Sequence, residues 1–177
     1  MNVSDENLAN AAADGDRTAF AALIERVYDR IHALSYRLTG SAADAEDLTQ
    51  DICAALPAKL QGFRGEARLQ TWLYRVVVNA VHDARRRNAM RSKASTGWGD
   101  WEIARQADLA ETAERRAWLI LAMNRLTPPE LRDTLVLMLE GLSHAEIGAI
   151  LGVSEGTVSW RISEAKKKLK LAKETEA

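Results

Sequence analysis

The chain has 177 residues, and 24 Lys and Arg stand against 25 Asp and Glu, so its formal net charge at pH 7 is -1. A composition of 47% hydrophobic and 28% charged residues is typical of a core-forming chain and excludes an intrinsically disordered protein, a collagen or a coiled-coil rod. The longest apolar run, Ala117 to Met123, is far shorter than the roughly 20 residues of a membrane-spanning helix, and the acidic N-terminus does not resemble a secretion signal. With Cys53 as the single cysteine, no intrachain disulfide can form, and we expect a cytoplasmic protein without metal or other cofactor and without membrane insertion.

Charge is distributed unevenly along the chain. Residues 1–56 carry 4 basic and 10 acidic residues, whereas residues 57–93 carry 9 basic and 2 acidic residues. An acidic segment directly before a basic one predicts a surface for one partner beside a surface for a polyanion.

Apolar residues recur every three or four positions along most of the chain, which is the period of α-helices. One such stretch runs from Phe20 to Leu38, and the next follows Ser41, which forms a predicted capping box with Asp44. A further helix is expected over residues 71–90, where no turn residue intervenes. The sequence carries no alternating strand pattern and predicts an all-α fold.

The helical pattern stops between residues 88 and 108, where Ser, Thr, Gly and Asp accumulate without apolar periodicity. We interpret this stretch as a linker between two small helical domains. The expected ranges are 1–91 for the first domain, 92–112 for the linker and 113–177 for the second domain. Trp98 and Trp101 are unusual in a linker because exposed tryptophan is costly, so we expect them to fold back onto a domain or to dock on a partner.

A helix-turn-helix is predicted in the second domain. Thr127 is expected to cap a helix that has a proline at its first position. Ser143 and Glu146 form a second capping box, which opens a short helix. Gly152 then permits a left-handed turn, and Ser154 caps the next helix.

The spacing of these elements is typical of DNA-binding proteins, in which the second helix of the motif enters the major groove. Gly148 is placed to supply the small residue that the close approach of the two helices requires. The candidate contacts to duplex DNA are Ser154, Glu155, Gly156, Thr157, Ser159, Trp160, Arg161 and Lys166.

Aromatic and cationic residues alternate in and before the predicted helix at residues 71–90. Phe63 and Arg64 lie in a glycine-containing loop, and Trp72, Tyr74 and Arg75 follow in the helix. Aromatic faces with guanidinium groups can capture unstacked bases of single-stranded nucleic acid. One of Trp72 and Tyr74 is expected to belong to the core instead.

Two separated blocks of sequence resemble the extracytoplasmic-function (ECF) group of bacterial RNA polymerase sigma factors, members of the sigma-70 family. The first block spans Asp44 to Asp51, Phe63 to Gly65 and Thr71 to Arg86, and the second spans Leu126 to Glu130 and Leu151 to Val158. The resemblance covers most of the chain and implies that the two domains are sigma regions 2 and 4.

The resemblance implies a specificity subunit that is not an enzyme, because its polymerase partner performs all nucleotidyl chemistry. Its partners would be the β′ and β subunits of core RNA polymerase, duplex promoter DNA at the -35 element, the melted non-template strand at the -10 element and an anti-sigma factor. The implied polymerase-binding residues are Asp44, Glu46, Asp47, Gln50 and Asp51. The implied -10 residues are Phe63, Arg64, Arg68, Trp72, Arg75, Asn79, Arg85, Arg86 and Arg87, and the -35 residues are those of the helix-turn-helix named above.

Some positions depart from the pattern of the family. Ser159 and Trp160 stand where members often carry Lys-Ser, so Trp160 is expected to pack against the DNA backbone or to contact a regulator. Val78 stands where a basic residue is common, which predicts a weaker grip on melted DNA.

Three other readings stay open. A regulator with a ligand-sensing first domain would explain the helix-turn-helix but neither the basic aromatic helix nor the acidic helix before it. An enzyme finds little support, because His32, His82 and His144 lie in separate segments and the sequence has no phosphate-binding loop. A sigma-like adaptor that no longer binds polymerase is disfavoured by the intact acidic helix from Asp44 to Asp51.

Overall fold

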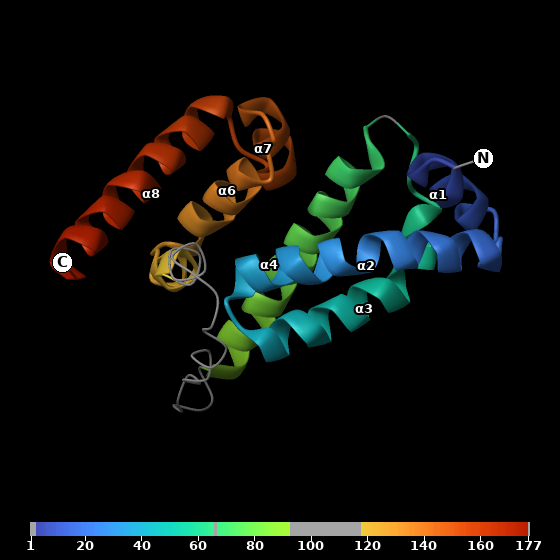
Figure 1. Cartoon of the computed structure of the whole chain (residues 1–177), viewed down its shortest axis with the longest axis horizontal. Helices are drawn as coiled ribbons and strands as arrows, with labels where there is room; N and C mark the ends of the chain where they lie inside the picture. The colour runs from blue at the N-terminus through green and yellow to red at the C-terminus, as the bar shows by residue number, and fades with distance from the viewer. Residues whose placement is uncertain (1–2, 66, 93–117, 177) are drawn as a thin grey trace, which may run out of the picture.

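The computed structural model describes residues 3–65, 67–92 and 118–176, and every regular element in this part of the chain is a helix (Figure 1). The elements are α1 (Asp5–Ala13), α2 (Arg17–Thr39), α3 (Ala42–Leu60), α4 (Leu69–Ser92), α6 (Pro129–Leu139), α7 (His144–Leu151) and α8 (Glu155–Glu176), with a short helical segment at 118–124 before α6. The all-α prediction is confirmed. Trp98, Trp101 and nearly all of the expected linker lie outside the described residues.

Helices α1 to α4 pack together, with α3 folding back along α2 (Figure 1). The reversal between α2 and α3 occurs at Gly40, whose φ of 75° ends α2, and at Ser41, whose Oγ accepts a hydrogen bond of 3.2 Å from the backbone N–H of Asp44. Ser41 therefore caps α3 as the sequence predicts.

Helices α6, α7 and α8 form the predicted helix-turn-helix (Figure 1). Ser143 and Glu146 make both bonds of the capping box at the start of α7, and Gly152 ends that helix with a φ of 67°. Ser154 Oγ then accepts a hydrogen bond of 3.2 Å from the N–H of Thr157 in the first turn of α8. Gly148 lies where a Cβ would stand 2.7 Å from the carbonyl oxygen of Val153, so its small size is required by the turn.

The expected start of α6 is wrong by one residue. The capping position is occupied by Pro128 and not by Thr127, and Pro129 is the first residue of the helix. Pro128 contributes its carbonyl oxygen to the N–H of Leu131 at 3.1 Å, while the ring of Pro129 fits the first turn because that position needs no N–H.

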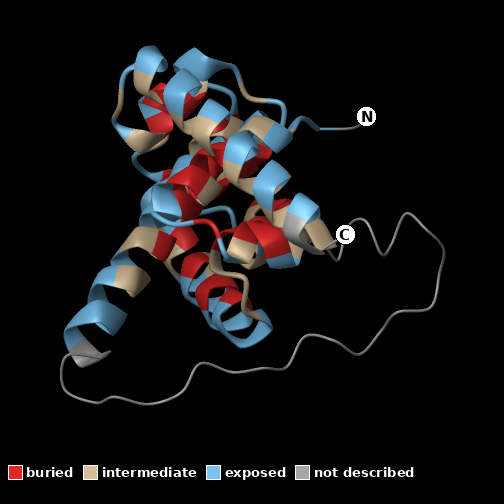
Figure 2. Cartoon of the chain, turned by 90° about the vertical axis from the view of Figure 1, so that its left-hand side faces the viewer, coloured by how far each residue is buried: buried red, intermediate tan, exposed pale blue. Residues whose placement is uncertain are grey.

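Buried residues from both halves of the chain form one contiguous hydrophobic cluster, which runs along the inner faces of the helices (Figure 2). Helix α6 packs against α2, and α7 packs against α4. Tyr74 is the member of its aromatic pair that enters this core, with 2% of its surface exposed. Val78 is also buried, at 1% exposure, on the inner face of α4. Its expected effect, a weaker grip on melted DNA, stays a prediction.

Candidate nucleic-acid and protein interfaces

Helix α3 exposes an acidic face. Its apolar residues Leu48, Ile52 and Leu56 are buried, and this turns the polar positions outward. The five residues predicted to bind polymerase are all exposed: Asp44, Glu46, Asp47, Gln50 and Asp51. Three of them, at positions 44, 47 and 51, follow the i, i+3, i+7 spacing of one helix face and line a groove, whereas Glu46 and Gln50 lie outside its lining.

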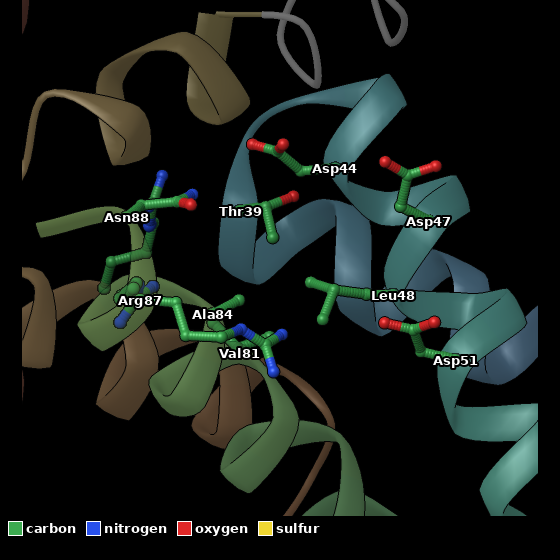
Figure 3. A pocket seen from close by; sticks show the side chains of 11 residues that line it. Thr39, Asp44, Asp47, Leu48, Asp51, Val81, Ala84, Arg87 and Asn88 are labelled. Carbon is green, nitrogen blue, oxygen red and sulfur yellow. The ribbon is translucent and has the colours of Figure 1, made fainter. Parts of the chain in front are cut away.

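This groove has a volume of about 560 Å³ and carries both signs of charge. Figure 3 shows the three aspartates of α3 on one side and Val81, Ala84, Arg87 and Asn88 of α4 on the other. Arg85 and, from α6, Arg132 complete the cationic side. Predicted polymerase-binding and DNA-binding residues are thus brought to opposite walls of one groove.

The loop before α4 and the first turn of α4 bring two aromatic rings into contact. The ring centroids of Phe63 and Trp72 lie 5.4 Å apart with the planes tilted by 59°, and both residues are half-buried. Gly65, in the left-handed conformation with a φ of 69°, turns the chain beside exposed Arg64 and Arg68. This arrangement offers partly exposed rings next to cations, which is the chemistry that stacks unpaired bases.

The cationic side chains of α4 differ in their exposure and in their partners. Arg75 and Asn79 are exposed, as are Arg86 and Arg87 near the C-terminal end. Arg86 forms an ion pair with Asp83, one helical turn before it. These side chains remain accessible to a polyanion.

Arg85 differs from its neighbours, because its guanidinium group is held by the second half of the chain. Its two terminal nitrogens donate to the carboxylate of Asp133 on α6 at 2.7 and 2.9 Å, and one of them also donates to the carbonyl of Leu38 at 2.7 Å. His82 Nε2 lies 2.9 Å from the same carboxylate. Arg85 was predicted to contact DNA, but in this structure its donors are occupied by protein.

Asp133 is almost completely buried, with 1% of its surface exposed. Burial by itself would raise the pKa of this carboxyl, but hydrogen bonds from His82 and Arg85 and the charge of Arg85 outweigh it and hold the pKa below its ordinary value. Asp133 was not identified as a functional residue from the sequence. Its position four residues before Leu137, on the apolar face of an amphipathic helix, could have indicated a buried acid.

Helix α8 exposes the residues expected to read duplex DNA. Ser154, Glu155, Gly156, Ser159, Trp160 and Lys166 are exposed, and Thr157 and Arg161 are half-buried. Trp160 has 60% of its surface exposed, an unusual state for so large an apolar ring. Ser159 Oγ lies 3.0 Å from Nδ1 of His144, which joins the recognition helix to the start of α7. Lys168, by contrast, donates to the carbonyl of Thr127 at 2.5 Å and supports the fold.

Among the residues that the structure describes, no group of three or more His, Cys, Asp or Glu side chains could hold a metal ion. Within the same residues, no helix combines the length and apolarity needed to cross a membrane. Cys53 is half-buried, and this burial raises the pKa of its thiol.

Family models match both halves of the chain. The model of sigma-70 region 2 matches residues 23–91, and that of sigma-70 region 4 matches residues 116–169. Among curated relatives, the ECF RNA polymerase sigma factor SigE of Mycolicibacterium smegmatis is 36% identical, in an alignment that covers 94% of this chain and 68% of SigE. SigM of Mycobacterium tuberculosis is 34% identical over 94% of this chain and 83% of SigM, and the sigma-E factor of Escherichia coli is 30% identical over 93% and 91%.

Solved structures share the fold. CnrH, solved with the cytosolic domain of CnrY, superimposes with a TM-score of 0.70 at 24% identity and covers 98% of this chain and 99% of CnrH. RpoE of Bartonella quintana, solved with the anti-sigma factor NepR, gives a TM-score of 0.69 at 23% identity, with 89% and 98% covered. The matches to both sigma regions, in order, and the identity to curated members over nearly the whole chain lead to one conclusion: the chain belongs to the ECF group of RNA polymerase sigma factors.

Proposed function

We propose that this sigma factor binds core RNA polymerase through the acidic face of α3 and directs initiation at promoters with -10 and -35 elements. Asp44, Glu46, Asp47, Gln50 and Asp51 are the proposed polymerase-binding residues and dock on the β′ subunit, and the β subunit is a further proposed partner of the protein. Their exposure supports this role, because all five side chains are accessible to a partner.

The -10 surface comprises the loop before α4 and the exposed side of α4. Phe63 and Trp72 stack the unpaired bases of the non-template strand, and the cations neutralise its phosphates. The proposed residues are Phe63, Arg64, Arg68, Trp72, Arg75, Asn79, Arg85, Arg86 and Arg87. Capture of bases and phosphates together offsets the cost of unstacking the duplex.

The -35 surface is Ser154 together with α8 as far as Lys166, which reads base edges in the major groove. Its proposed residues are Ser154, Glu155, Gly156, Thr157, Ser159, Trp160, Arg161 and Lys166. The exposure of six of these eight residues supports this assignment. Apart from its chain neighbours and the backbone of its own helix, the nearest atom of the described residues to a Cβ built at Gly156 is Ser154 Oγ at 3.8 Å, which leaves room for a DNA backbone to approach.

In this proposal region 2 comprises residues 1–91, region 4 comprises residues 113–177, and residues 92–112 join them. The protein is a non-enzymatic subunit that works in the cytoplasm, where its polymerase works, and needs no cofactor. We also propose control by an anti-sigma factor, in keeping with the NepR complex of a protein that shares the fold.

One observation carries the proposal over the reading as a ligand-sensing regulator. The chain has a second aromatic and cationic surface, at Phe63, Trp72 and Arg75, outside its helix-turn-helix. A regulator that binds only duplex DNA has no use for partly exposed rings that stack unpaired bases.

The test is a pull-down of sigma-free core polymerase with this protein, followed by run-off transcription from a promoter library with the reconstituted holoenzyme. We expect core binding, and initiation at promoters that share two sequence blocks. Tight duplex binding by the free protein without core binding would establish the ligand-sensing regulator instead.

A further inference from the structure

A hydrogen bond between the side chains of His144 and Ser159 joins the two helices of the helix-turn-helix. His144 is the first residue of α7, Ser159 lies in the second turn of α8, and both residues are exposed. Nδ1 of His144 lies 3.0 Å from Ser159 Oγ. An exposed bond of this kind adds little to stability, because water would satisfy both groups almost as well. Its place on the proposed -35 surface points to a role in recognition.

The other hydroxyl groups at the start of the recognition helix are used by the helix itself. Ser154 Oγ lies 2.9 Å from Thr157 Oγ1 and also accepts the backbone N–H of Thr157 at 3.2 Å. Ser159, by contrast, shares an exposed face of α8 with Glu155 and Gly156, which lie four and three residues before it. Its hydroxyl is therefore the one placed to meet base edges in the major groove.

The two helices that carry this pair are fixed relative to each other. The capping box of Ser143 and Glu146 holds the start of α7, and Gly152 ends the helix in the left-handed conformation. At Gly148 the turn approaches α7 so closely that a Cβ would stand 2.7 Å from a backbone oxygen. Side chains on such rigid elements keep their geometry, so the imidazole is presented to Ser159 before any DNA is bound.

The imidazole determines in which direction the hydroxyl hydrogen of Ser159 points. An uncharged imidazole has one N–H and one acceptor nitrogen. Because an imidazole nitrogen is far more basic than an alcohol oxygen, the hydroxyl donates to Nδ1 and the ring hydrogen lies on Nε2. The oxygen of Ser159 then has only lone pairs to offer. An unattached serine either donates or accepts at a base edge, whereas this one only accepts.

We propose that His144 is a positioning residue for the -35 element, which directs Ser159 to accept a hydrogen bond from a base amino group in the major groove, N6 of adenine or N4 of cytosine. This proposal rests on the proposed function in one respect, the use of α8 at the -35 element. The direction of the hydrogen bond between the two side chains is a property of the free protein and does not depend on that function.

The direction of this bond is measured by long-range hydrogen–nitrogen NMR correlation of the full chain with isotope-labelled histidine, at about pH 8, where imidazole is uncharged. The signals that disappear in His144→Asn are those of His144. We expect Nδ1 to be the nitrogen without hydrogen, and Ser159→Ala to shift its resonance. Ser163→Ala, at an exposed serine one turn later on α8, is the matched control and should leave it unchanged. A hydrogen on Nδ1, or equal spectra of the two serine variants, would overturn the proposal.

Base analogues identify the group that Ser159 reads. A promoter selected in the library test is rebuilt with purine in place of each adenine of the -35 element, or pyrimidin-2-one in place of each cytosine, so that one amino group is removed at a time. Run-off transcription by the wild-type holoenzyme is expected to fall about three- to tenfold at one position, the effect of one hydrogen bond. In Ser159→Ala the same analogue should cause no further loss. An equal loss in wild type and Ser159→Ala at every position contradicts the proposal.

Two amide substitutions separate positioning of Ser159 from a DNA contact made by His144 itself. The amide oxygen of asparagine takes the place of Nδ1 and can accept from Ser159, whereas the amide of glutamine is one methylene longer and reaches the place of Nε2. We expect His144→Asn to keep the sensitivity to the amino group and His144→Gln to lose it. The reverse result, or equal sensitivity of the two variants, would overturn the proposal.

The NMR measurement needs neither polymerase nor promoter, so its outcome is independent of the proposed function. If the wild-type protein supports no initiation on the unmodified promoter, the proposed function has failed, and the NMR measurement alone then decides whether His144 directs the hydroxyl of Ser159.

Discussion

Gly148 and Gly156 lie eight positions apart in the helix-turn-helix, but only one of them is needed by the fold. A Cβ at Gly148 would stand 2.7 Å from the backbone oxygen of Val153, whereas a Cβ at Gly156 would meet nothing closer than Ser154 Oγ at 3.8 Å. We expect Gly148→Ala to lower the free energy of unfolding by about 1–3 kcal/mol, because a backbone atom must move. Gly156→Ala is expected to be neutral or slightly stabilising.

Urea unfolding followed by circular dichroism measures both glycine variants. Equal midpoints would show that the close approach at Gly148 costs nothing to relieve. If Gly156→Ala retains full stability but supports less transcription, the open space at this glycine serves the DNA.

Trp160 is expected to contribute contact energy to the -35 interface, since its ring is 60% exposed at the centre of the recognition surface. Trp160→Ser should reduce run-off transcription about tenfold, the effect of one lost groove contact, while core binding stays unchanged. Leu171→Ser is the matched control, because Leu171 is 55% exposed at the far end of the same helix. Equal transcription by the two variants would contradict a role of Trp160 in binding the -35 element and leave contact with a regulator as its expected role.

Arg85 illustrates what a sequence cannot show at this scale. Arg85, Arg86 and Arg87 look equivalent as a basic run, but consecutive residues of a helix point in directions about 100° apart. Only Arg85 points toward α6, and its partner Asp133 lies 48 positions away. The chemistry of the run was predictable, whereas its division between a protein contact and a free surface depends on tertiary packing.

At the scale of elements, α3 exposes acidic and α4 basic side chains, so substitutions in the two helices should impair different steps of initiation. Asp47→Asn with Asp51→Asn removes exposed charge from α3, so the affinity for core polymerase should fall about three- to tenfold. Arg75→Ala should leave that affinity unchanged and reduce open-complex formation, which permanganate reactivity of the melted strand measures. Glu25→Gln with Asp29→Asn, at two exposed acids of α2, controls for net charge.

A shared phenotype for the α3 and α4 variants would contradict the assignment of polymerase binding to one helix and strand capture to the other. Raising the salt concentration adds a second criterion, because the difference between wild type and the α3 double variant should shrink as exposed charges are screened.

Element boundaries were predictable where a side chain makes the cap. Ser41, Ser143 and Ser154 each accept the expected backbone N–H, because a capping hydroxyl acts over three residues and needs no tertiary partner. The prediction of Thr127 as the cap of α6 was wrong because two consecutive prolines follow it, and no side-chain hydrogen bond determines which of them begins the helix.

At the scale of the whole molecule, the expected separation into two helical halves did not predict that they would lie against each other. The contacts between them join Tyr74 to Glu140 and Arg85 to Asp133, and these pairs have no local signature in the sequence. Each half alone satisfies the amphipathic pattern of a small domain, so periodicity gives no information about their contact.

The buried carboxylate of Asp133, which holds Arg85 and His82, predicts how this contact depends on pH. The pKa of Asp133 is lowered in the folded protein, so its stabilising contribution is complete above the ordinary value of 3.8 and is lost as the pH falls through the lower folded value. The radius of gyration should therefore stay constant from neutral pH down to about 4 and increase below it. Asp133→Asn should lack this acid-dependent step, and an identical step in the variant would assign it to other carboxyls.

The contiguous core across both halves also has a thermodynamic consequence for assembly. Separating the halves exposes apolar surface to water, which raises the heat capacity, whereas burial of a new interface lowers it. If polymerase separates the halves, calorimetry of their association should give a smaller negative heat-capacity change than the area of the interface implies. The difference between the expected and the measured heat-capacity change then measures how much apolar core surface of the sigma factor becomes exposed on binding to polymerase.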